Sequence, residues 1–173
     1  MIVRKAEEKD LNRINDIYNN LFDYENKNGS STNWQRGVYP SLKNAEEKLA
    51  ANELFVAEVN DEIIGSVVLN NEQLPEYSKF KWLFKAKDNE VGVIHTLCMD
   101  PKYFGKGYAS KIVKFSEDYF RNQGCKVMRF DTYEHNMAAT NMYIKLGYRI
   151  SGVEEFFFQG FIKENLRCFE KEL

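Results

Sequence analysis

Apolar residues recur along the chain at two spacings, and each spacing predicts a different kind of element. Between residues 7 and 26 they fall every three or four positions, which predicts an amphipathic helix. A polar stretch over 26–33 predicts a loop. After Pro40, a second helix is expected from about Ser41 to Asn52, with Ser41 as its N-cap. The apolar stripe of the first helix consists of Leu11, Ile14, Ile17, Tyr18, Leu21 and Phe22.

Shorter apolar runs predict strands. Residues 55–59 and 63–69 flank a polar turn and predict a hairpin. Gly124 ends a third helix that begins near Gly107, and Gly147 ends a fourth that starts at Asn136. Further extended segments are expected at residues 2–4, 91–99, 127–133, 148–152, 156–158 and 165–172.

The order of these elements defines the expected fold class. Hairpin strands come first and β-α-β units follow. This order predicts an α/β (α+β) fold with a mixed, mostly antiparallel central sheet of about seven strands, flanked by helices on both faces. A chain of 173 residues suits one domain, so residues 1–173 are expected to form a single domain. The aromatic-bearing connection over 70–90 is expected to lie on the surface beside the site.

The segment 91–115 changes from strand to helix through a glycine-bearing turn. Gly105 and Gly107 lie just before the helix and place no Cβ in the way of an approaching anion. The first N–H groups of a helix have no partner inside it, and the helix dipole is positive there. We therefore expect a pyrophosphate-bearing ligand on the backbone amides from Gly105 to Ala109.

Composition excludes several classes of function. The formal net charge of −2 argues against a nucleic-acid partner. With no signal pattern and no apolar run near ~20 residues, we expect no membrane association and a cytoplasmic location. The chain has two histidines and three scattered cysteines, Cys98, Cys125 and Cys168, without a CxxC pair. We therefore expect reduced thiols and no metal site.

Two motifs together resemble the GNAT superfamily of N-acetyltransferases. The turn reads Lys102-Tyr103-Phe104-Gly105-Lys106-Gly107 and is similar to the family's Q/R-x-x-G-x-G/A turn. Lys102 departs from the usual Gln or Arg, although lysine can still donate. The second motif, similar to N-x-x-A-x-x-x-Y-x-x-x-G-(F/Y), is formed by Asn136, Ala139, Tyr143, Gly147 and Tyr148. With the element order, the resemblance covers nearly the whole chain and implies the acyl-CoA N-acyltransferase fold.

The resemblance implies an acyltransferase that uses acetyl-CoA (coenzyme A). The backbone of Leu97, Cys98 and Met99 would pair with the pantetheine arm, and an N–H there, most simply that of Met99, would donate to the thioester carbonyl. Asn136 would contact pantetheine. Tyr143 would protonate the leaving thiolate, or it would only order the cofactor. The cofactor-binding residues implied are Leu97, Cys98, Met99, Lys102, Gly105, Lys106, Gly107, Tyr108, Ala109, Asn136, Ala139 and Tyr143.

The general base has several candidates. Strand alternation would place His95 on one face with Val93, Leu97 and Met99, and an imidazole suits base work near neutral pH. The alternative is a buried histidine satisfied by a backbone carbonyl. Glu58 and Glu72, acting directly or through water, are the other candidates. Cys98 has no obvious paired base, which favours direct acetyl transfer over a covalent intermediate.

The acceptor is expected in a pocket shaped by residues 23–39 and 70–90. Aromatic walls suit a small primary amine such as an amino acid, a polyamine or an arylalkylamine. Alternatively, these aromatics pack the loops onto the core. A protein or peptide acetyltransferase (N-terminal or lysine) and a non-catalytic acyl-CoA sensor are the competing functions. The chain could be a monomer or a homodimer that uses Phe156 to Phe158 and Phe161. The expected substrate-binding residues are Trp34, Tyr39, Tyr77 and Trp82.

Overall fold

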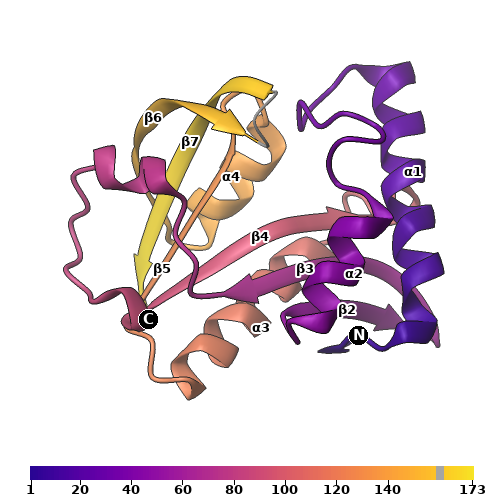
Figure 1. Ribbon diagram of the computed structural model, residues 1–173, viewed down its shortest axis with the longest axis horizontal. Helices are drawn as coiled ribbons and strands as arrows, with labels where there is room; N and C mark the ends of the chain where they lie inside the picture. Colours follow the sequence, from indigo (N-terminus) through magenta and orange to yellow (C-terminus); the bar gives the residue numbers. More distant parts are fainter. Residues whose placement is uncertain (159–161) are drawn as a thin grey trace. The chain divides into compact units, whose positions relative to one another are not determined.

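A computed structural model describes residues 1–158 and 162–173, and within them it contains the strands and helices expected from the sequence, in the expected order (Figure 1). None of the described helices is long and apolar enough to cross a membrane. The elements are β1 (Ile2–Lys5), α1 (Leu11–Asn28), α2 (Leu42–Ala50), β2 (Leu54–Val59), β3 (Glu62–Asn70), β4 (Val91–Met99), α3 (Tyr108–Asn122), β5 (Val127–Tyr133), α4 (Met137–Lys145), β6 (Arg149–Phe158) and β7 (Ile162–Glu172).

The strands form one seven-stranded sheet in the order β1-β2-β3-β4-β5-β7-β6. β2 is antiparallel to both β1 and β3, and β7 is antiparallel to both β5 and β6. β4 pairs in parallel with β5 over Val91–Val93. The predicted mixed sheet is therefore confirmed.

The chain divides into two compact units. Unit 1 comprises residues 1–30, 34–69 and 95–115, and unit 2 comprises residues 31–33, 70–94 and 116–173. Strand β4 and helix α3 each begin in one unit and end in the other. The single domain expected for residues 1–173 stays a prediction.

Unit 1 has a core between α1, α2 and the strands β2 and β3. The apolar stripe predicted for the first helix is buried there, apart from Leu11, which packs against the cluster from a half-buried position. α1 begins at Leu11 rather than at residue 7, because residues 8–10 form a 3₁₀ turn whose Asp10 carboxylate accepts a hydrogen bond from the Glu7 N–H. The predicted cap of α2 is confirmed, since the Ser41 hydroxyl accepts from the Asn44 N–H.

Unit 2 has a core that includes part of the connection between β3 and β4. Tyr77, in the 3₁₀ helix η2 (Pro75–Lys79), is only 2 % exposed and packs in one cluster with Phe80 and Phe156. Its hydroxyl donates a 2.7 Å hydrogen bond to Asp131 of β5. The expectation that this connection lies wholly on the surface is therefore wrong for Tyr77 and Phe80, because a polar partner inside unit 2 draws the ring of Tyr77 inward.

The phenylalanines proposed as a dimer contact divide between core and surface. Phe156 is 1 % exposed, whereas Phe157 is 60 % exposed. The side chain of Phe158 and the whole of Phe161 lie outside the described residues. A monomeric or homodimeric state stays a prediction.

Candidate functional site

The predicted glycine turn leads directly into α3 in unit 1. Gly105 and Gly107 have φ angles of +73° and +76°, and a Cβ added at either would meet no atom within 4 Å. A left-handed φ costs an L-residue roughly 1–2 kcal/mol, which explains glycine at both positions. The turn is exposed, and α3 starts at Tyr108. Backbone N–H groups at this helix start are thus open to an anion.

Two aromatic rings and two lysines surround the turn. The Tyr103 and Tyr108 rings meet edge to face with centroids 6.1 Å apart. The Lys106 ammonium lies 4.9 Å from the centre of the Tyr103 ring, and the Lys111 ammonium lies 5.5 Å from that of Tyr108. These cations add positive charge beside the start of the helix.

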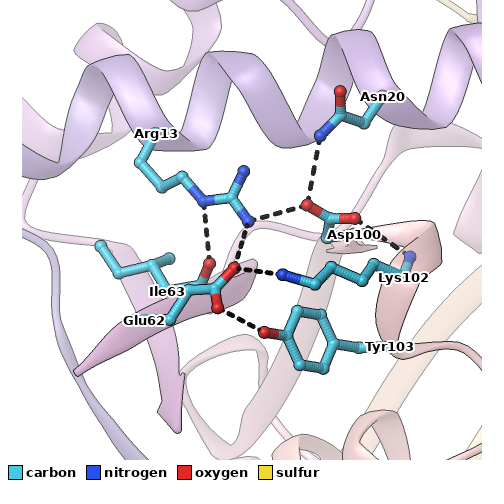
Figure 2. Close-up of polar contacts among 7 residues, drawn as sticks. All are labelled: Arg13, Asn20, Glu62, Ile63, Asp100, Lys102 and Tyr103. Carbon is cyan, nitrogen blue, oxygen red and sulfur yellow. Dashed lines mark hydrogen bonds and ion pairs between the residues drawn. The ribbon is translucent and has the colours of Figure 1, made fainter. Parts of the chain in front are cut away.

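The Asp100 carboxylate anchors the start of the turn to α1, as Figure 2 shows. It accepts hydrogen bonds from Arg13 Nη2 at 2.7 Å and from Asn20 Nδ2 at 3.2 Å. Its other oxygen accepts from the Lys102 backbone N–H at 3.1 Å. Asp100 is 4 % exposed, so this carboxylate is a buried junction between helix and turn.

A second carboxylate, Glu62, holds the side chains of the turn (Figure 2). It accepts from the Tyr103 hydroxyl at 2.6 Å and pairs with the Lys102 ammonium at 3.2 Å. The ammonium of Lys102 is therefore paired with Glu62. The expected contact of Lys102 with the cofactor stays a prediction. No sequence pattern indicates Arg13, Asn20 or Glu62, because they lie 40–90 residues from the turn.

Replacing Asp100 by alanine should destabilise the fold by about 2 kcal/mol, because Arg13, Asn20 and the Lys102 N–H would lose a shared buried acceptor. It should also weaken acetyl-CoA binding several-fold through a displaced turn. Chemical denaturation and calorimetric titration measure the two effects. Asp118→Ala is the matched control, since among the described residues the exposed Asp118 pairs with Arg121 of the same helix alone. Equal stability and affinity in the two variants would contradict the anchoring role.

The same anchor makes unit 1 sensitive to acid. Burial pushes the pKa of Asp100 upward, but hydrogen bonds from Arg13, the Lys102 N–H and Asn20 outweigh it and hold that pKa below its ordinary 3.8. The folded state therefore binds the proton less readily than the unfolded state. The stabilisation is present above about pH 4 and is lost as the pH falls through the lowered pKa.

Strand β4 contains a backbone irregularity beside the residues expected to bind pantetheine. Thr96 has a φ of +46°, and its hydroxyl shares a short hydrogen bond with the Tyr39 hydroxyl. His95, Thr96 and Leu97 are all half-buried. Regular alternation therefore cannot be assumed through Thr96, and the face shared by His95 and Leu97 stays a prediction. The base role of His95 stays a prediction.

The remaining candidates on unit 1 differ in environment. Cys98 is 1 % exposed, and burial raises the pKa of its thiol, which disfavours the thiolate needed for nucleophilic attack. Met99 is 7 % exposed. Glu58 is held by Arg4 at 3.1 Å. Glu58 thus already has a cationic partner, and this pairing makes its carboxylate less available as a general base.

The second motif lies on α4 of unit 2. Asn136 caps the helix, since its Oδ1 accepts from the Ala139 N–H at 3.0 Å. This leaves the Asn136 side-chain NH₂ group as a donor. The sequence motif did not reveal that Asn136 caps the helix. The contact of Asn136 and Ala139 with pantetheine stays a prediction.

Tyr143 is 5 % exposed and packs on Phe130 and Phe169, with ring centroids 4.5 Å and 5.1 Å away. Burial and the charge of Asp131 raise the pKa of Tyr143, so its phenol is protonated at neutral pH. Among the described residues of unit 2, no group accepts a hydrogen bond from its hydroxyl. The Tyr143 hydroxyl therefore keeps its proton and can still donate it in a hydrogen bond.

The four aromatics expected to line an acceptor pocket form two pairs. Trp34 and Tyr39 of unit 1 meet edge to face at 5.9 Å. In unit 2, the Trp82 ring lies 5.5 Å from that of Tyr77, and its Nε1 donates to the Tyr77 carbonyl at 2.9 Å. Tyr77 and Trp82 thus have packing roles in unit 2. Contact of any of the four with an acceptor stays a prediction.

Two carboxylates of unit 2, the half-buried Asp131 and the buried Glu164, were missed from the sequence. Asp131 of β5 accepts from Tyr77, and Glu164 of β7 accepts from Asn33 Nδ2 at 2.9 Å. Glu164 is 7 % exposed. The available signal was its position between Ile162 and Leu166, where the alternation of β7 calls for an apolar residue. Glu72, the base candidate in the connection after β3, is by contrast exposed.

Two curated relatives are similar to this chain. An uncharacterised N-acetyltransferase from Methanocaldococcus jannaschii is 24 % identical over 115 residues, which is 66 % of this chain and 45 % of the relative. Streptothricin acetyltransferase from Escherichia coli is 25 % identical over 121 residues, which is 70 % of this chain and 59 % of the relative. The matches thus span about half the length of these relatives.

The fold and the family are both shown by comparison. A Salmonella typhimurium protein described as an acetyltransferase, solved with its cofactor acetyl-CoA, is 18 % identical, with a TM-score of 0.71 over 100 % of this chain and 94 % of that one. The expected acyl-CoA N-acyltransferase fold is therefore confirmed. The model of the acetyltransferase (GNAT) family matches residues 12–148, a range that includes both motifs. The chain belongs to the acetyltransferase (GNAT) family.

Proposed function

We propose that this protein is an acetyl-CoA-dependent N-acetyltransferase that transfers an acetyl group directly to the primary amine of a small molecule. The observation that carries the proposal is the exposed turn at Gly105 and Gly107, whose left-handed glycines leave the start of α3 open. Family membership makes a coenzyme A derivative the natural anion for such a turn. When bound, acetyl-CoA would supply an activated acyl thioester.

The residues of unit 1 fit a coenzyme A derivative. The amides from Gly105 to Ala109 would bind the pyrophosphate, because no side chain stands within 4 Å of the Cβ positions of the two glycines. The backbone from Leu97 to Met99 would donate to pantetheine and to the thioester carbonyl. Burial of Cys98 favours direct transfer to the amine, since a protonated thiol is a poor nucleophile.

In unit 2, Tyr143 would act as the general acid. Its raised pKa keeps the phenol protonated, and its hydroxyl is not committed to an acceptor within that unit. A proton held there can pass to the sulfur as the thiol leaves. The side-chain NH₂ of Asn136, free of its capping bond, would donate to pantetheine.

A small amine is the acceptor that we favour. One relative is named for acetylating streptothricin, a small molecule. The aromatic pair of Trp34 and Tyr39 offers an apolar wall of a size that suits such a ligand. With three buried free thiols among the described residues, we also propose a reducing, cytoplasmic location.

A panel of primary amines and N-terminal peptides, with acetyl-CoA and detection of the released thiol, tests this function. We expect thiol release with at least one small amine and tighter binding of acetyl-CoA than of a non-nucleotide thioester. Release only with peptides would replace the small-molecule acceptor by a peptide. Binding of acetyl-CoA without release for any acceptor would overturn the enzymatic function.

A further inference from the structure

The connection between β3 and β4 carries a run of basic residues on unit 2. It contains only two short 3₁₀ helices, η2 and η3 (Asp88–Glu90), and a connection of this length without longer elements is usually functional. Residues 79–87 contain four lysines and no acidic residue, although the formal net charge of the chain is −2. A local positive charge on an acidic chain favours an anionic partner at this segment.

Exposed and half-buried side chains alternate along residues 81–87. Trp82, Phe84 and Ala86 are half-buried, and Trp82 and Ala86 pack against the apolar cluster of unit 2. The side chains between them are exposed, and Leu83 keeps 60 % of its surface accessible. A period of two places the odd-numbered side chains on one side of the segment, toward solvent. These four exposed residues form a surface that we call the basic stripe: Lys81, Leu83, Lys85 and Lys87.

Two buried charged residues hold the backbone in the middle of the basic stripe. The Glu170 carboxylate of β7 is fully buried and accepts from the N–H groups of Leu83 at 2.8 Å and Phe84 at 3.2 Å. Arg129 of β5 donates from Nη2 to the Phe84 carbonyl at 2.8 Å. Hydrogen bonds to ionised groups are stronger than neutral ones. The segment is therefore fixed to the sheet of unit 2, although it has no regular secondary structure.

The aromatic ring of the segment is turned toward the same anchor. The Arg129 guanidinium lies 4.5 Å from the centre of the Trp82 ring. Trp82 Nε1 donates to the Tyr77 carbonyl at 2.9 Å. Trp82 thus contributes to holding the segment, and the side chains that remain toward solvent are those of the basic stripe.

Two lysines of the basic stripe have no partner among the residues that the structure describes. Neither Lys81 nor Lys85 forms a hydrogen bond or an ion pair there. Lys79, by contrast, donates to the Glu155 carbonyl at 3.1 Å, and the charge of Lys87 acts on Glu90. Two uncompensated ammonium groups therefore stand two residues before and two residues after the exposed Leu83.

We propose that the basic stripe binds an extended acidic segment of a partner protein. Alternate side chains of an extended chain are roughly 6–7 Å apart, so a peptide with the same period can face the basic stripe residue by residue. Two carboxylates on either side of an apolar residue would match Lys81, Leu83 and Lys85. A further carboxylate would match Lys87. This surface goes beyond the proposed acetyl transfer, which uses none of these lysines.

The same side chains disfavour two other polyanions. A nucleic-acid strand stacks its bases on exposed aromatic rings, whereas the ring of Trp82 is half-buried against Arg129. A membrane surface takes up several apolar side chains together with the cations, and within residues 81–87 Leu83 alone is a large apolar side chain that is mostly exposed. An acidic peptide requires only spaced cations and one apolar contact, which the basic stripe supplies.

A peptide titration followed by fluorescence anisotropy tests the basic stripe. The probe is a labelled peptide in which two glutamates, a valine between them and a further glutamate alternate with serines, and its analogue has glutamine in place of glutamate. We expect the wild type to bind the glutamate peptide about tenfold more tightly than the analogue at low salt, because exposed ion pairs are individually weak and screened by salt. The double variant Lys81→Gln with Lys85→Gln should lose this difference.

The matched control removes two positive charges elsewhere. Lys114 of α3 and Lys145 of α4 are also exposed and unpaired among the described residues, so Lys114→Gln with Lys145→Gln makes the same change in net charge. We expect this control to bind both peptides as the wild type does. An equal loss of affinity in the two double variants would show a general charge effect and would contradict a defined surface.

Charge reversal tests the contact itself and separates it from acetyl transfer. Lys85→Glu should bind a peptide with lysine at one glutamate position more tightly than the wild type does, and should release thiol from acetyl-CoA with a small amine at the wild-type rate. Equal affinity of the wild type for the glutamate peptide and its glutamine analogue would overturn the inference and leave the proposed acetyl transfer intact. If vesicles containing phosphatidylserine, or a single-stranded RNA, bind in place of the peptide and are lost in Lys81→Gln with Lys85→Gln, the acidic peptide is the wrong partner.

Discussion

Tyr143→Phe is expected to lower kcat about 100-fold at saturating acetyl-CoA and amine, with less than a twofold change in the Kd of acetyl-CoA. The substitution removes one hydroxyl and keeps the ring that packs on Phe130 and Phe169. Because the pKa of Tyr143 is raised by burial, the wild type should show no basic limb from this group below about pH 10. Steady-state kinetics and calorimetric titration measure both quantities.

Tyr148→Phe is the matched control for this prediction. Tyr148 belongs to the same aromatic cluster, with its ring 4.7 Å from Phe130, and its hydroxyl contacts the Met128 sulfur. We expect Tyr148→Phe to change the stability as little as Tyr143→Phe does, and to keep the wild-type kcat. Equal turnover of Tyr143→Phe and the wild type would remove the general acid and leave Tyr143 as a packing residue.

The double substitution Gly105→Ala with Gly107→Ala should weaken acetyl-CoA binding about 100-fold. Each alanine must adopt a left-handed φ at a cost of roughly 1–2 kcal/mol, and the turn can relieve this strain by changing the direction of its N–H groups. An added methyl group also stands where a phosphate would approach. Calorimetric titration of acetyl-CoA into each single variant and the double variant checks the magnitude.

Gly124→Ala provides a control with the same backbone strain. Gly124 follows α3 with a φ of +81°, and an added Cβ there also meets no atom within 4 Å. We expect Gly124→Ala to lose stability as each turn variant does, and to bind acetyl-CoA as the wild type does. If all three single variants bind acetyl-CoA equally, the turn does not hold the pyrophosphate.

Elements with a local signal were predictable from the sequence. The strand expected at residues 127–133 is β5, and the cap expected at Ser41 is present. Both depend on neighbours a few residues away. The inward position of Tyr77 could not be predicted, because it depends on Asp131, which is 54 residues away. Segment composition indicates a loop there, whereas a long-range hydrogen bond decides which side chains are buried.

In the candidate site too, features with a local signal were predictable, whereas long-range contacts were not. The glycine turn was predictable because Gly105 and Gly107 are required by their own φ angles. The anchor between Arg13 and Asp100 joins residues 87 positions apart, and no periodicity indicates such a pair. Thr96 adopts a left-handed φ without being glycine, so the break in strand alternation beside His95 has no sequence signal. Glu164 was visible only as an acid in an apolar phase of its strand.

Direct acetyl transfer to the amine is tested by following the acetyl group itself. The protein is incubated with acetyl-CoA labelled with ¹³C in the acetyl group and with the amine that gives most thiol release, and mass spectrometry then examines amine and protein. Direct N-acetyl transfer predicts the label on the nitrogen of the amine and none on the protein. Label retained on Cys98, or an amine that remains unlabelled while acetyl-CoA binds, would contradict direct N-acetyl transfer.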